Sequence, residues 1–215
     1  MRWYASFLFI FLLNLEKTIH PMLQPPAIFQ IRITLVGITP PVWRRLQVPS
    51  DLFLHDLHKV IQTAMGWENS HLHQFVKNGR TFGIADDEFE NTERFMDYTS
   101  IRLIDVLNKE NETLRYIYDF GDTWVHEITL EKQLKAIPNE FYPFCTEGAR
   151  SCPPEDCGGP AAYMDMVKVF NNPDNPERQG ILEWLDEDWN PETFNIDIIN
   201  EMLMEEDFGC LPLID

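Results

Sequence analysis

Two histidines separated by one residue are the first pattern in this sequence that could carry chemistry. His71 and His73 fall in a segment, residues 71–77, whose composition predicts a β-strand. Side chains at positions i and i+2 of a strand share one face, so both imidazoles are expected to project together. Paired imidazoles suit zinc and other borderline metal ions. The alternative is that each ring forms only local hydrogen bonds.

A second pattern combines two aspartates with a third histidine in residues 118–126. Asp119 and Asp122 flank Gly121, which can adopt a positive φ, so the turn can direct both carboxylates toward one point. His126 shares its parity with apolar residues and is therefore expected on the apolar face of a strand. The alternative interpretation is a turn whose aspartates accept hydrogen bonds from backbone N–H groups, with His126 as a core residue.

The two patterns together define one candidate site. If the strands that carry His71 and His126 are neighbours, the site would hold one ion between five side chains: His71, His73, Asp119, Asp122 and His126. Such an ion would lower the pKa of a bound water, which is the chemistry of a metal-dependent hydrolase or nuclease.

Three cysteines form the third pattern. Cys145, Cys152 and Cys157 lie within 13 residues and could hold zinc, with His126 or another side chain as the fourth ligand. Their spacing departs from the regular pairs of a zinc ribbon, so the alternative is a rigid, proline-bounded loop with inert thiols. In an exported protein these thiols and Cys210 could instead form disulfides.

Local sequence patterns predict the strands and helices that carry these residues. Alternation predicts strands at 29–35, 42–48, 71–77, 80–84, 114–118 and 123–130, with a hairpin at Asn78-Gly79. A helix is expected after Ser50 as its N-cap, through residues 54–65, and ended by Gly66. Ser100 is expected to cap a short helix, and residues 143–160 are expected to be irregular. Further helices are expected from Gly159, around 181–185, and after Asn195 as a cap.

This order of elements predicts an α+β fold. It consists of a mixed or antiparallel sheet with one early helix, followed by a C-terminal helical segment packed on the sheet. One domain is expected over residues 25–207, with a tail at 208–215. Residues 1–24 are interpreted as a leader or an over-extended gene start, with Met22 as the alternative initiator. Their apolar run is too short to span a membrane. The protein is expected in the cytoplasm, or exported if residues 1–15 act as a signal peptide.

The acidity of the chain is concentrated in its last third. The formal net charge is −18. A charge this high can indicate intrinsic disorder, but the hydrophobic content of 44% excludes an intrinsically disordered acidic protein. From residue 140 onward there are 3 basic and 18 acidic side chains. Direct DNA binding is therefore not expected from the C-terminal half. The acidic helices are interpreted either as a solvated face or as a surface for a basic protein.

Several motifs occur together in one order. They are Pro-Val-Trp-Arg-Arg at 41–45, Leu-His at 57–58, Met-Gly-Trp at 65–67, His-Leu-His-x-Phe at 71–75, Tyr-Asp-Phe-Gly-Asp-x-Trp-x-His at 118–126 and Cys-Pro-Pro-Glu-Asp-Cys-Gly-Gly at 152–159. This set resembles the plasmid pRiA4b ORF-3-like family, which is related to passenger proteins of transposable elements. The resemblance covers about residues 28–205. It implies a compact α+β domain, found in prokaryotes and often on mobile elements, without an established activity.

The leading functional expectation is a soluble, non-enzymatic binding or accessory module linked to mobile elements. Most motif residues would then be structural: Trp43, Arg44, Gly66, Trp67, Gly121, Trp124, Glu155, Asp156, Gly158 and Gly159. One alternative is the metal-dependent hydrolase or nuclease described above. The other is an acidic decoy that occupies a basic nucleic-acid-binding protein through its C-terminal helices.

Overall fold

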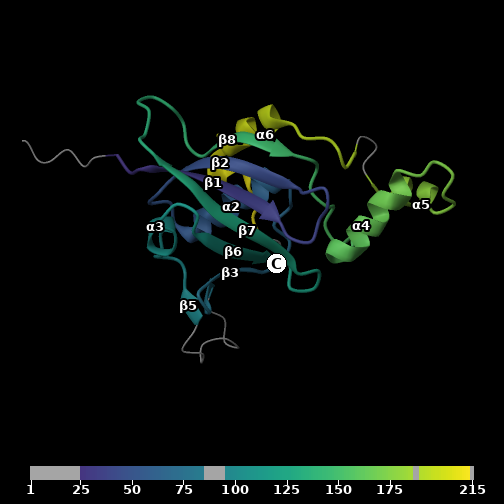
Figure 1. Cartoon of the computed structure of the whole chain (residues 1–215), viewed down its shortest axis with the longest axis horizontal. Helices are drawn as coiled ribbons and strands as arrows, with labels where there is room; N and C mark the ends of the chain where they lie inside the picture. The colour runs from purple at the N-terminus through teal and green to yellow at the C-terminus, as the bar shows by residue number, and fades with distance from the viewer. Residues whose placement is uncertain (1–24, 85–94, 186–188, 214–215) are drawn as a thin grey trace, which may run out of the picture.

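The structure, a computed structural model, describes residues 25–84, 95–185 and 189–213. The predicted leader at residues 1–24 lies outside the described residues. The described part is α+β, as the sequence predicts, and it is built on one mixed sheet of eight strands (Figure 1). No helix in this part of the chain is long and apolar enough to cross a bilayer.

The strand order in the sheet is β5-β4-β3-β6-β7-β1-β2-β8. Only β5 runs parallel to its neighbour, and the other pairs are antiparallel. The bounds are β1 Ile28–Leu35, β2 Trp43–Pro49, β3 His73–Lys77, β4 Arg80–Gly83, β5 Phe95–Asp97, β6 Thr113–Tyr118, β7 Trp124–Leu134 and β8 Phe144–Ala149. One face of the sheet is buried, and the other carries polar side chains such as the ion pair Arg45–Glu131.

Helices cover the buried face and one edge of the sheet. The bounds are α2 Leu54–Met65, α3 Leu103–Val106, α4 Gly159–Phe170, α5 Arg178–Trp184, α6 Ile196–Leu203 and the 3-10 turn η1 Glu206–Gly209. Helix α2 packs against α6 and η1, and α6 packs against β8. Helices α4 and α5 extend to one side of the sheet (Figure 1). The C-terminal segment therefore packs on the sheet mainly through α6, whereas η1 packs on α2 and α6.

The sequence correctly predicted turns and helix ends at positions where the backbone conformation favours a particular residue type. Asn78 and Gly79 adopt φ angles of 52° and 75° in the β3–β4 hairpin, as that turn requires. Gly66 ends α2 with a φ of 81°, and Asn195 caps α6 by accepting hydrogen bonds from two backbone N–H groups. These three predictions are confirmed.

Two predicted caps are wrong. Helix α2 begins after Phe53, and Ser50 instead lies in the turn that follows β2: its N–H donates to the carbonyl of Ala27, and its carbonyl accepts from Ile104 N. The short helix α3 begins after Arg102 rather than Ser100. Both shifts have one cause, because the segments before α2 and α3 pair with each other through an isolated bridge.

Strand β8 lies where the sequence indicated irregular chain. Its residues have no clear alternation, yet β8 extends the sheet beyond β2. The side chain of Asn200 in α6 accepts a hydrogen bond from Cys145 N and donates to Cys145 O, at 2.7 and 3.0 Å. These bonds pair backbone groups of an edge strand with a side chain that is 55 residues away in the sequence. A local sequence pattern therefore does not predict this strand.

Candidate functional site

Three segments meet at one end of the sheet. They are the start of β3, the turn between β6 and β7 at residues 119–123, and the loop at residues 151–158. The carbonyl of Leu72 accepts a hydrogen bond from Asp119 N at 2.9 Å, which joins the first two segments. Strand β6 lies between β3 and β7, so the strand that carries His126 is not the direct neighbour of the strand next to His71.

One histidine in this region faces several carboxylates. His71 Nε2 lies 3.8 Å from Asp119 Oδ2, 3.9 Å from Glu155 Oε2 and 3.2 Å from Asp156 Oδ1. These four residues are called the His71 cluster below. The Nε2 atom is enclosed, and it has no hydrogen-bond partner among the described residues. The side chain of Asp119 is nearly buried, whereas that of Asp156 is 76% exposed.

The two carboxylate oxygens of Asp119 have different surroundings. Its Oδ1 atom accepts hydrogen bonds from the backbone N–H groups of Gly121 and Asp122, at 2.9 and 3.3 Å. Asp119 itself adopts a φ of 56°. Oδ1 therefore stabilises the turn, as one of the two sequence interpretations expects, while Oδ2 faces His71.

Asp122 connects this turn to the loop that follows β8. Its Oδ2 atom accepts a hydrogen bond from Gly158 N at 2.9 Å. The backbone of Gly159 passes so close that a Cβ atom there would lie 2.7 Å from Asp122 O. Gly158 and Gly159 both have positive φ angles, of 90° and 79°. The two glycines thus allow the loop to lie directly against the turn.

Glu155 is the main polar connection between the loop and the sheet. Its carboxylate accepts hydrogen bonds from Tyr118 OH and Glu68 N, at 2.8 and 2.9 Å, and from Ser70 Oγ. Nearby, Trp67 Nε1 donates to the carbonyl of Pro153 at 2.9 Å. Charge-assisted bonds of this kind are stronger than neutral ones, so Glu155 fixes the loop in place.

His73 lies in a different environment from His71. Its ring stacks on that of His58 in α2, with centroids 3.4 Å apart, and its Nε2 is 2.9 Å from Tyr98 OH. Burial lowers the pKa of His73 to about 4. Burial and the neighbouring His73 lower the pKa of His58 to about 2. Both rings are therefore neutral at pH values near 7, which allows them to stack.

His126 is completely buried within the core. Its Nδ1 lies 3.1 Å from the carbonyl of Trp124, and its ring meets the edge of Trp67. Burial lowers the pKa of His126 to about 3. The five residues of the predicted site therefore do not converge on one point. His71 and Asp119 lie together, whereas Asp122, His73 and His126 contact other residues.

The three cysteines have separate environments. Cys145 Sγ contacts the carbonyl of Glu147, and Cys152 Sγ lies 3.0 Å from the sulfur of Met65. Burial raises the pKa of Cys145 and of Cys152 to about 11, and that of the half-buried Cys157 to about 12. Within the described residues, the three thiols form no group with ligand atoms close enough for one ion.

Arg44 is one of the motif residues for which the sequence predicted a structural role. Its side chain is buried, which is unusual for an arginine. Its guanidinium donates to the carbonyls of Ala64, Trp43 and Ala149, at 2.8, 2.9 and 3.0 Å. It thereby joins the end of α2 to β2 and β8. Arg45, in contrast, forms ion pairs with Glu131 and Glu147 on the other face of the sheet.

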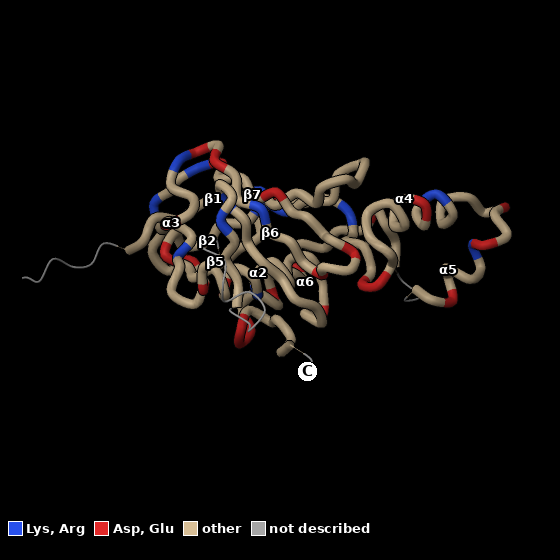
Figure 2. The backbone as a smooth tube through the Cα atoms, turned by 90° about the horizontal axis from the view of Figure 1, so that it is seen from below, with Lys and Arg blue, Asp and Glu red and all other residues tan. Residues whose placement is uncertain are grey.

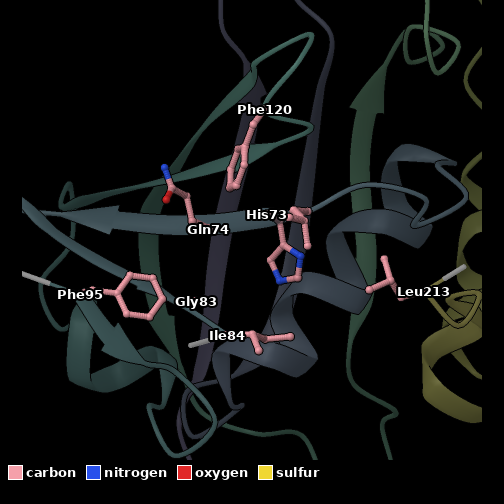
Figure 3. A pocket seen from close by; sticks show the side chains of 8 residues that line it. His73, Gln74, Gly83, Ile84, Phe95, Phe120 and Leu213 are labelled. Atoms are coloured by element: carbon pink, nitrogen blue, oxygen red, sulfur yellow. The ribbon is translucent and has the colours of Figure 1, made fainter. Parts of the chain in front are cut away.

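An apolar pocket adjoins the His71 cluster. It has a volume of about 190 Å³ and is lined by Leu72, His73, Gln74, Gly83, Ile84, Phe95, Phe120 and Leu213 (Figure 3). Figure 3 shows Phe120, Ile84 and Leu213 arranged around the His73 ring. Leu72, Ile84 and Phe120 are large apolar side chains, yet they are 55%, 61% and 44% exposed. Sequence reasoning missed this pocket, although a phenylalanine within a polar turn was an available signal.

Comparison with known proteins identifies the family. The family model for plasmid pRiA4b ORF-3-like proteins matches residues 27–198. The chain belongs to this family. The curated protein y4hQ of Sinorhizobium fredii (strain NBRC 101917 / NGR234), described as uncharacterized, is 35% identical over 159 residues, covering 74% of this chain and 80% of that protein.

A solved structure supports the fold of this pRiA4b ORF-3-like protein. The crystal structure of MM3350 from Methanosarcina mazei Go1, described as a protein of unknown function, has a TM-score of 0.74 and 34% sequence identity. The similarity covers 80% of this chain and 96% of that chain. The resemblance seen in the sequence motifs is thus confirmed at the level of family and fold.

Proposed function

We propose that this protein is a binding or accessory module whose apolar pocket accepts a side chain of a partner protein. The observation that carries the proposal is the pocket beside β3, with its exposed apolar lining. Exposed apolar side chains that gather around a hollow are typical of binding sites, whereas scattered ones need no explanation. We place this module in the cytoplasm, which cell fractionation tests.

The size of the pocket restricts its occupant. Sites for drug-sized molecules and cofactors usually enclose about 300–1,000 Å³. A pocket of about 190 Å³ is better suited to one aromatic or branched aliphatic side chain. A short peptide segment that presents one such side chain as an anchor matches this volume and the apolar lining.

The chemistry of the pocket favours binding over catalysis. The titratable imidazole in its lining is His73, whose pKa of about 4 leaves it neutral near pH 7. Its Nε2 already contacts Tyr98 OH, and burial raises the pKa of that phenol to about 12. An efficient general acid or base has a pKa near the working pH, which neither group has.

A link to mobile genetic elements is the second part of the proposal. It rests on the family, whose name refers to an open reading frame of a plasmid. The pocket would then recognise a protein that is encoded on, or acts with, such an element. Comparison of the genes that flank members of this family tests this part separately from the pocket.

Peptide selection against the full chain tests the pocket directly. We expect the selected peptides to share one apolar anchor, and Ile84→Asp to weaken their binding by about tenfold or more, since it places a charge at the pocket. Ile137→Asp is the matched control, because Ile137 is similarly exposed, at 54%, but does not line the pocket. Equal binding by the wild type and Ile84→Asp would refute the proposal, as would peptides without an apolar anchor.

An acidic surface supports a second candidate function, the binding of a basic protein. Every described aspartate and glutamate between residues 165 and 207 is exposed, and the basic side chains in this range are Lys168 and Arg178. Figure 2 shows acidic positions along α4 and α5. Binding of a lysine-rich peptide that weakens steeply with salt, and that is reduced by Glu177→Gln with Glu183→Gln, would support this candidate. Binding that is insensitive to these changes would contradict it.

A further inference from the structure

We propose that His71, Asp119 and Asp156 form a binding site for a divalent transition-metal ion, with Zn²⁺ as the best match. This site is distinct from the apolar pocket and does not depend on the proposed function. Among the described residues, it is the one group of three or more His, Cys, Asp and Glu side chains whose ligand atoms all lie within 4.8 Å of one another.

The separation of the ligand atoms is close to that of an occupied site. Bonds of about 2.0–2.2 Å from zinc to nitrogen or oxygen place tetrahedral ligands roughly 3.4 Å apart. His71 Nε2 lies 3.2 Å from Asp156 Oδ1 and 3.8 Å from Asp119 Oδ2. The remaining adjustment falls on Asp156, whose side chain is 76% exposed and can change rotamer at little cost.

The hydrogen bonds around the cluster leave Asp119 Oδ2 and His71 Nε2 available to bind a metal ion. Asp119 Oδ1 is occupied by two backbone N–H groups, which orients Oδ2 toward His71. His71 Nε2 is enclosed and has no hydrogen-bond partner within the described part of the chain. In the tautomer that is protonated at Nδ1, the Nε2 atom presents a lone pair to the negatively charged carboxylates, which is an unfavourable contact. A bound cation would replace it with favourable contacts to His71, Asp119 and Asp156.

The types of the ligand atoms select the class of metal. One imidazole nitrogen with carboxylate oxygens suits zinc or manganese, whereas magnesium and calcium prefer oxygen alone and copper(I) prefers sulfur. Glu155 lies at the border of the site, but its carboxylate already accepts three hydrogen bonds. It therefore orients the loop that carries Asp156 and leaves direct ligation to the other three residues.

A metal ion at this position would join three segments that are far apart in the sequence. His71 precedes β3, Asp119 belongs to the β6–β7 turn, and Asp156 lies in the loop before α4. Because the ion would bind the folded arrangement and not the unfolded chain, its binding would raise the midpoint of thermal unfolding.

Metal titration of the full chain, after removal of metal with a chelator, tests the proposal. We expect one equivalent of Zn²⁺ to bind and to raise the unfolding midpoint. Asp156→Asn should weaken binding by about tenfold or more. Asp165→Asn is the matched control, because its side chain is 74% exposed but lies in α4, and it should leave the affinity unchanged. Because Asp156 is exposed, its substitution should not prevent folding.

Cobalt distinguishes this site from binding by the cysteines. Co²⁺ bound to nitrogen and oxygen should show weak visible bands without the near-ultraviolet charge-transfer band of a thiolate ligand. A strong thiolate band would overturn the proposal, as would Zn²⁺ affinity that is unaffected by both Asp156→Asn and His71→Gln. Absence of binding up to about 1 mM Zn²⁺ would also overturn it and leave an ion pair of His71 with its carboxylates.

Discussion

Substitution of the buried histidine His126 should change how the stability of the protein depends on pH. His126 is completely enclosed, and burial lowers its pKa from 6.5 to about 3 in the folded protein. In the unfolded chain the same imidazole is in water and binds a proton below about pH 6.5. The stability contribution of neutral His126 is therefore fully present above pH 6.5 and is lost as the pH falls from 6.5 toward 3.

The expected size of this loss follows from the difference in pKa. Each pH unit between the two pKa values costs about 1.4 kcal/mol, because only the unfolded state binds the proton. Between pH 7 and pH 5, His126 should therefore lower the free energy of unfolding by about 2 kcal/mol. His126→Asn keeps a donor for the carbonyl of Trp124 and removes the titrating group, so it should remove this part of the pH dependence.

The assay is urea unfolding of both proteins at each pH. The difference in unfolding free energy between pH 7 and pH 5 should be smaller by about 2 kcal/mol in His126→Asn than in the wild type. Phe75→Leu is the control: it should lower stability equally at both pH values, because it does not titrate. An identical pH dependence in His126→Asn and the wild type would show that burial does not keep this imidazole neutral.

A close glycine contact and two buried thiols also have consequences that can be measured. Gly159→Ala should destabilise the protein by about 3 kcal/mol or more, because its Cβ would lie 2.7 Å from Asp122 O at a positive φ, whereas Gly66→Ala, with a similar φ and open space, should cost about 1 kcal/mol. Equal losses in thermal or urea unfolding would contradict the close contact. Cys145 and Cys152 should react with a thiol reagent near pH 8 only as fast as the protein unfolds, because burial holds both pKa values near 11. Rapid labelling of both in the folded protein, detected by mass spectrometry, would contradict their burial.

The sequence predicted those parts of the fold that are determined by neighbouring residues. Asn78-Gly79 specifies a hairpin because both positions need positive φ, and Asn195 caps α6 through its own side chain. The burial of His126 followed from strand parity alone. In contrast, strand β8 pairs with β2 and is bonded by Asn200, and the residues before α2 and α3 form a bridge with each other. Such contacts join residues that are distant along the chain, so no local pattern contains them.

The same distinction applies to the candidate site. The sequence marked His71 and Asp119, which do lie together, and it could not show that His73 stacks on His58 in α2. Asp156 was interpreted as a structural motif residue, whereas the fold brings its Oδ1 to 3.2 Å from His71 Nε2. The apolar pocket was also not predictable, because its lining comes from separate strands, a turn and the C-terminal segment.

The proposed function requires the apolar pocket to receive an apolar side chain of a partner protein. Methyl NMR of the full chain during titration with a selected peptide observes the pocket itself, because the pocket residues Leu72, Ile84 and Leu213 carry methyl groups. These signals should shift with the peptide, and replacing the peptide's apolar anchor with alanine should abolish the shifts. Shifts confined to methyl groups outside the pocket, or unchanged by loss of the anchor, would contradict the proposed function.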